Sequence, residues 1–168
     1  AEEMFVGTAA LGIPLAVAIG DVQTGPTLAI GGTIGLGVGT ASGLVINRWK
    51  SPSEGDAMVL TTFQTLGAGN GVGWGLALGL DREAGWMGLG GLVLGTVGGL
   101  YAMDAHPAAG DVATVRAGLL WGSLAGLSVR AIDPRDRFWD VATFVVGADI
   151  GAAAGLLLAV QQGAPSRE

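Results

Sequence analysis

Cysteine is absent from this 168-residue sequence, histidine occurs once, and only 13% of the residues are charged. Without cysteine the chain has no disulfide framework, no thiolate metal site and no cysteine nucleophile. His106 is the single histidine and lies in a loop sequence with proline, which disfavours a metal site, a Ser-His-Asp set and haem ligation within a helix bundle. The eight Lys and Arg residues are scattered and the net charge is -6, so nucleic acid is not an expected partner.

Glycine, by contrast, occupies 32 positions, and half of the residues are apolar. Collagen is excluded because glycine does not recur at every third residue and proline occurs only 6 times. Disorder is excluded because the apolar content is high and the net charge is modest. The chain has the length of one domain, and its glycines therefore predict close packing of the backbone.

Charged residues gather in short clusters, and six largely apolar segments lie between them. Four of these segments carry no charge and are about 17 to 26 residues long, which matches the length of a helix that crosses a bilayer. We predict an all-α fold with about six transmembrane-type helices in three antiparallel hairpins, forming one repeat domain over residues 1–168. The helices are expected at about 4–20, 22–47, 57–80, 84–103, 111–130 and 139–161.

Glycine recurs at every fourth position within these segments, and residues four apart lie on one face of a helix. Each segment therefore carries a groove in which a neighbouring backbone can approach closely. The spacing resembles that of glycine-zipper (GxxxG-repeat) helical membrane proteins, a resemblance that implies close helix association and oligomer formation. The predicted helix-packing residues are Gly31, Gly35, Gly39, Gly43, Gly67, Gly71, Gly75, Gly79, Gly91, Gly95, Gly99, Gly118, Gly122, Gly126, Gly147, Gly151 and Gly155.

Longer stretches also repeat. The sequence Pro-Ser-Glu-Gly-Asp at 52–56 matches Pro-Ala-Ala-Gly-Asp at 107–111, so this match relates segments that are two apart along the chain. Asp-Val-Ala-Thr occurs at both 111–114 and 140–143, and this match relates adjacent segments. The repeat unit is thus one helix with its turn, and two units make a hairpin. An aspartate precedes five of the six segments, where it can accept hydrogen bonds from free helix N-terminal amides.

The hydropathy pattern favours a multi-pass membrane protein. Segment 22–47 has no charged side chain and so lacks the polar stripe of a helix at a water-exposed surface. Trp49, Trp86 and Trp139 fall at segment ends, where amphipathic rings favour the lipid headgroup level. The alternative is a soluble helical repeat that is buried against partner chains, because glycine lowers the hydropathy of each segment.

Arg116 and Asp149 each interrupt an apolar segment, and an unpaired charge in hydrocarbon costs roughly a few kcal/mol or more. If the last two helices form an antiparallel hairpin, Asp149 lies about one helical turn from the level of Arg116. The two residues are therefore a possible buried ion pair that fixes helix register. Alternatively, Arg116 extends to the membrane interface, or the pair belongs to an ion or proton pathway.

These observations predict a structural integral membrane protein that self-associates or docks as a subunit or scaffold of a larger membrane assembly. Its expected partners are the lipid bilayer and a second copy or another membrane protein. No catalytic, cofactor-binding or metal-binding residue is expected, and the chain is not expected to be an enzyme. Large side chains such as Leu60 and Leu92 are expected on faces other than the glycine faces. The main alternative is a channel or small transporter with a polar path through Arg116, Asp149, Gln64 and Asn70.

Overall fold

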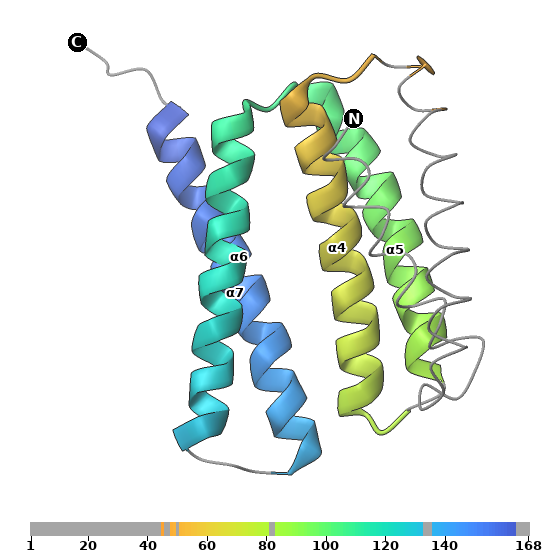
Figure 1. The fold of residues 1–168 in the computed structure, drawn as a ribbon, viewed down its shortest axis with the longest axis vertical. Helices are drawn as coiled ribbons and strands as arrows, with labels where there is room; N and C mark the ends of the chain where they lie inside the picture. Colours follow the sequence, from red (N-terminus) through yellow and green to blue (C-terminus); the bar gives the residue numbers. More distant parts are fainter. Residues whose placement is uncertain (1–44, 46–47, 50, 81–82, 133–135, 164–168) are drawn as a thin grey trace.

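A computed structural model describes residues 45, 48–49, 51–80, 83–132 and 136–163 of the chain. The described residues form helices α4 (Glu54–Ala77), α5 (Glu83–Ala102), η1 (Met103–Ala105), α6 (Ala109–Ile132) and α7 (Arg137–Gly163), and they include no β-strand (Figure 1). The all-α prediction is confirmed for this part of the chain. The helices expected at about 4–20 and 22–47, which are predicted to form the N-terminal hairpin, lie outside the described residues apart from Val45.

Helix α4 begins and ends three residues earlier than its predicted span of 57–80. Ser53 is its N-cap: the Ser53 hydroxyl accepts from the Asp56 N–H at 3.2 Å, and the Ser53 N–H donates to Asp56 Oδ2 at 2.9 Å. This capping box places Asp56 inside the first turn and not in front of the helix. At the other end Gly79 has φ +74, and the Leu80 N–H donates to the Gly75 carbonyl at 2.9 Å. Gly79 therefore terminates α4, and nothing lies within 4 Å of the position that its Cβ would take.

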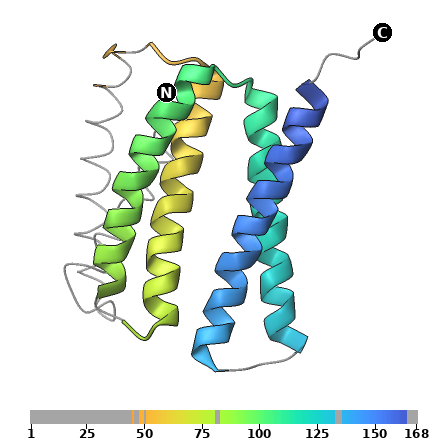
Figure 2. The ribbon, with the colours of Figure 1, turned by 180° about the vertical axis from the view of Figure 1, so that it is seen from behind.

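The four long helices of the described ranges form two antiparallel hairpins, α4 with α5 and α6 with α7 (Figure 1). Helix α4 is central: it contacts α5 on one side and both α6 and α7 on the other. The reverse view shows the same order, with α4 between α5 and the second hairpin (Figure 2). Several polar residues of α4 are consequently buried: Asp56, Thr61, Thr62 and Gln64.

Backbones meet at glycine inside each hairpin. A Cβ on Gly67 would lie 2.0 Å from the Gly91 carbonyl oxygen, and a Cβ on Gly122 would lie 2.1 Å from that of Gly147. Residues other than glycine would therefore force the helices apart. The predicted packing glycines whose Cβ would approach a neighbouring helix or chain segment within 3 Å are Gly67, Gly71, Gly75, Gly91, Gly95, Gly99, Gly118, Gly122, Gly126, Gly147, Gly151 and Gly155. Gly31, Gly35, Gly39 and Gly43 lie outside the described residues.

The two hairpins close through the same series of contacts. In the first hairpin Gly95 approaches the Phe63 carbonyl, and in the second Gly151 approaches the Gly118 carbonyl. The offset along the chain from Phe63 to Gly118 is the same as that from Gly67 to Gly122 in the neighbouring contact. Both ends of helix α6 are related to those of α4 by this same offset. The repeat in the sequence is thus a repeat of hairpin geometry.

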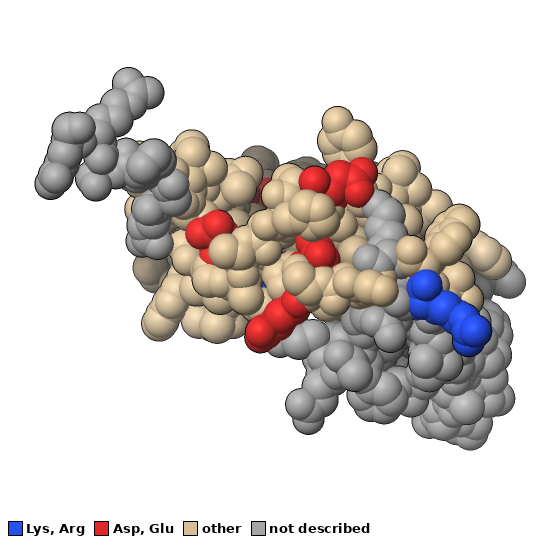
Figure 3. All heavy atoms as spheres, turned by 90° about the horizontal axis from the view of Figure 1, so that it is seen from above, with Lys and Arg blue, Asp and Glu red and all other residues tan. Residues whose placement is uncertain are grey.

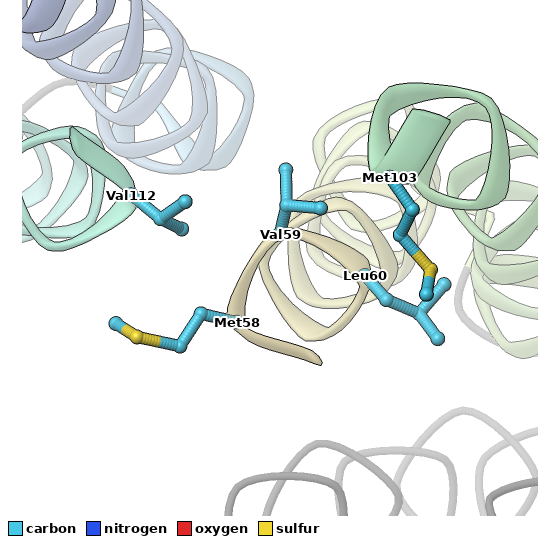
Figure 4. Packing of buried hydrophobic residues seen from close by; sticks show 5 residues of the cluster. All are labelled: Met58, Val59, Leu60, Met103 and Val112. Atoms are coloured by element: carbon cyan, nitrogen blue, oxygen red, sulfur yellow. The ribbon is translucent and has the colours of Figure 1, made fainter. Parts of the chain in front are cut away.

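The larger buried cluster joins the hairpins at one end of the bundle. Met58, Val59 and Leu60 of α4 pack with Met103 of η1 and Val112 of α6 (Figure 4). Leu60 is 2% exposed and its side chain covers Gly99, while Leu92 is buried against Ala68. The expectation that Leu60 lies away from the glycine faces is therefore wrong, because Gly99 on α5 leaves room for this large side chain of α4.

Three of the described helices are long and apolar enough to cross a membrane, with spans at Glu83–Ala105, Ala109–Val129 and Phe138–Gln161. Helix α4 is not among them, because threonines, Gln64 and Asn70 lower its hydropathy. The outer surface of α5, α6 and α7 carries large apolar side chains: Leu94 is 75% exposed, Trp121 69% and Ile150 65%.

Candidate functional site: polar contacts between the hairpins

Arg116 of α6 reaches across to the first half of α4. Its Nε donates to Thr62 Oγ1 at 2.8 Å, and its Nη2 donates to the Met58 carbonyl at 3.1 Å and to Thr61 Oγ1. Both threonine hydroxyls donate in turn to the Met58 carbonyl. The guanidinium has several N–H donors and no acceptor, and this cluster supplies buried oxygens on the neighbouring helix to receive them. Arg116 thereby joins the two hairpins.

Asp149 of α7 contacts the second half of the same helix. The Asn70 side-chain amide donates to Asp149 Oδ1 at 2.8 Å. Asp149 is exposed, and the hydrogen bonds described for Asp149 and for Arg116 are both with residues of α4 and not with each other. The reasoning that placed them opposite each other treated the last hairpin alone, whereas α4 packs against both of its helices.

Gln64 supplies a polar contact inside the first hairpin. Its amide donates to the Thr96 hydroxyl of α5 at 3.2 Å, and Thr96 donates back to the Leu92 carbonyl of its own helix at 2.9 Å. The polar side chains that keep α4 from being a candidate membrane span thus hydrogen-bond to the helices around it. Such contacts specify which faces of the helices meet.

A second polar cluster lies where α4 begins. Asp56 is 5% exposed, and its Oδ1 has no hydrogen-bond partner but lies 3.7 Å from His106 Nδ1. Burial raises the pKa of Asp56, whereas hydrogen bonds from the backbone and side chain of Ser53 and the nearby His106 lower it, with a net result below the usual value of 3.8. The His106 side chain itself is 82% exposed.

This cluster also fixes the linker between the hairpins. A Cβ on Gly55 would lie only 1.9 Å from the Pro107 carbonyl oxygen, so the linker rests directly on the first turn of α4. No group of three or more potential metal ligands is present in the described ranges. The arrangement therefore holds the linker against α4 and offers no cluster of cation ligands there.

Thr61 and Thr62 are the contact residues that sequence reasoning missed. Threonine in an apolar helix usually returns its hydroxyl to the backbone and gives no signal of its own. The signal that could have found them is the repeat, since Thr61 and Arg116 occupy equivalent positions in its two copies.

No family model, curated protein or solved structure matches the chain in the three comparisons made. Function has therefore to be inferred from the chain's own geometry.

Proposed function

We propose that this chain is a structural integral membrane protein whose helices pack through glycine zippers and which self-associates or docks as a subunit of a larger membrane assembly. The observation that carries the proposal is the distribution of side chains by size and polarity. Glycines lie at the closest helix contacts within each hairpin, while many large apolar side chains, such as Leu94, Trp121 and Ile150, lie on the outside. A surface of that kind suits hydrocarbon, whereas in water large apolar patches drive association.

The cost of glycine supports the same proposal. Each glycine within a helix costs up to about 1 kcal/mol relative to alanine in water, so helices this rich in glycine need an additional source of stability. A bilayer favours the helical state because backbone polar groups must be paired there. Close contact between the glycine-rich backbones then supplies the additional stability.

Docking is supported by an apolar groove of about 410 Å³ on the α6/α7 hairpin. Gly122, Ala125 and Gly126 form part of its lining, and Trp139 and Ile150 are exposed beside them. A groove lined by small residues and flanked by large ones is the shape into which another membrane helix packs.

The experiment is sequential extraction of the expressed chain from membranes with high salt, alkaline carbonate and then detergent. Release by detergent alone supports the proposal, and release by salt or carbonate would replace it with the soluble helical repeat. Sizing in detergent then tests association: Ala125→Leu, which fills the groove, should reduce the oligomer, while Ala154→Leu on an exposed part of α7 should not. An unchanged oligomer in Ala125→Leu would exclude this groove as the contact.

A channel or small transporter is the second candidate. It is favoured by the polar contacts of Arg116, Asn70 and Asp149, which lie at successive levels along α4. Replacing Arg116 with Met and Asp149 with Asn in one chain should abolish flux in reconstituted vesicles while assembly is retained. Unaltered flux in the double variant would remove this candidate.

A further inference from the structure

A cavity of about 260 Å³ lies between the two hairpins, separate from the glycine contacts. Val59 and Leu66 of α4 line it on one side, and Ala152 and Ala159 of α7 on another. Each of these pairs spans two helical turns, which is about 10 Å along a helix. The cavity is therefore a slot that runs parallel to the helices.

The walls of the slot are apolar along its length. Thr62 contributes a hydroxyl that already donates to the Met58 carbonyl, and the remaining polar side chain, Asp111, belongs to the first turn of α6. A cavity lined in this way does not retain water, because a buried water needs two to four polar partners. Its occupant must be apolar over most of its length.

The end marked by Asp111 lies at the boundary of the candidate membrane span Ala109–Val129. An apolar slot that starts at this level and continues inward matches an amphiphile whose polar head stays at the membrane surface. We propose that the slot holds one acyl chain of a bilayer phospholipid, with the headgroup beside Asp111. This assignment rests on the proposed membrane location.

The charge at this end of the bundle selects the headgroup. Glu54 and Asp111 belong to the first turns of two helices that begin here, and the view onto this end shows several carboxylates and a smaller basic area towards one edge (Figure 3). Like charges repel, so a zwitterionic phosphatidylcholine head is favoured over anionic phosphatidylglycerol.

The test is native mass spectrometry of the chain after reconstitution with equal amounts of phosphatidylcholine and phosphatidylglycerol, extraction in mild detergent and removal of free lipid. The wild type is expected to retain phosphatidylcholine. Ala152→Phe, which fills the slot, should lower the retained phosphatidylcholine by roughly tenfold or more, because several methylene groups lose their burial. Ala154→Phe, on an exposed part of the same helix outside the slot, is the matched control and should retain it.

A second variant leaves the slot walls intact. Asp111→Asn should keep a bound phospholipid but weaken the preference for phosphatidylcholine, because one of the carboxylates at this end is removed. Equal retention by Ala152→Phe and wild type, no retained lipid in the wild type, or a wild-type preference for phosphatidylglycerol would overturn the assignment. Any of these results in a chain released from membranes only by detergent would leave the proposed function standing, whereas release by carbonate would remove both.

Discussion

Adjacent glycines on α5 separate the effect of helix contact from that of helix propensity. A Cβ on Gly91 would lie 2.0 Å from the Gly67 carbonyl oxygen, whereas a Cβ on Gly90 would have nothing within 4 Å. Ordinary contact begins at 3.4 Å, so Gly91→Ala requires the two backbones to move apart until this distance is restored. Backbone atoms on both sides leave no side chain that can rotate away. Overpacking of this kind costs about 1–3 kcal/mol.

Gly90→Ala is the matched variant. In both Gly90→Ala and Gly91→Ala the higher helix propensity of alanine stabilises the helix by about 1 kcal/mol in water. This contribution cancels between them, and Gly91→Ala should unfold with a free energy about 1–3 kcal/mol below that of Gly90→Ala. The assay is titration with sodium dodecyl sulfate from mild-detergent micelles, followed by far-ultraviolet circular dichroism. Gly151→Ala in the second hairpin should behave like Gly91→Ala, because its Cβ would lie 2.1 Å from the Gly118 carbonyl oxygen. Equal midpoints for Gly91→Ala and Gly90→Ala would refute the reasoning.

Three further outcomes follow from the polar contacts, each measured against wild type in the same unfolding titration. Arg116→Met should lower the free energy of unfolding by about 2 kcal/mol, because the charge-assisted bonds from Arg116 to the Thr62 hydroxyl and the Met58 carbonyl are lost; a variant as stable as wild type would show that the contact contributes nothing. Asn70→Leu should cost about 0.6 kcal/mol, since the contact with Asp149 is exposed and contributes no more than an average interhelical hydrogen bond, and a loss several times larger would contradict that assignment. Asp56 has a lowered pKa in the folded chain, so its stabilising contribution is complete above the usual value of 3.8 and is lost as the pH falls through the lower folded value. Stability measured as the pH falls below about 4 should therefore decrease more steeply in wild type than in Asp56→Asn, and parallel curves would argue against the coupling.

Helix positions in the described chain were largely readable from the sequence. Charge clusters bounded the segments, and the predicted end at residue 103 differs by one residue from the end of α5 at Ala102. The start of α4 was misplaced because Asp56 was read as a residue in front of the helix. Ser53 followed by Asp56 three residues later is a capping signature, and it would have placed the start correctly.

Contacts between the hairpins could not be read in the same way. Periodicity shows which residues share a face of one helix, but it does not show which helix that face meets. Asp149 was therefore assigned to Arg116, although its hydrogen-bond partner is Asn70 on α4. The central position of α4 follows from tertiary packing. The role of its threonines as acceptors for Arg116 is visible only when α6 is placed beside α4.

Because both hairpins close through glycines at equivalent positions, α4 and α7 carry surfaces that would also fit each other during folding. Correct pairing must then depend on positions where the copies differ. Arg116 stands where the first copy has Thr61, and Asn70 stands where the second copy has Ala125. At the equivalent positions 61 and 116 one copy of the repeat therefore has a hydrogen-bond acceptor and the other a donor. This difference favours the observed pairing of the hairpins over an exchange of helices between two copies of the chain.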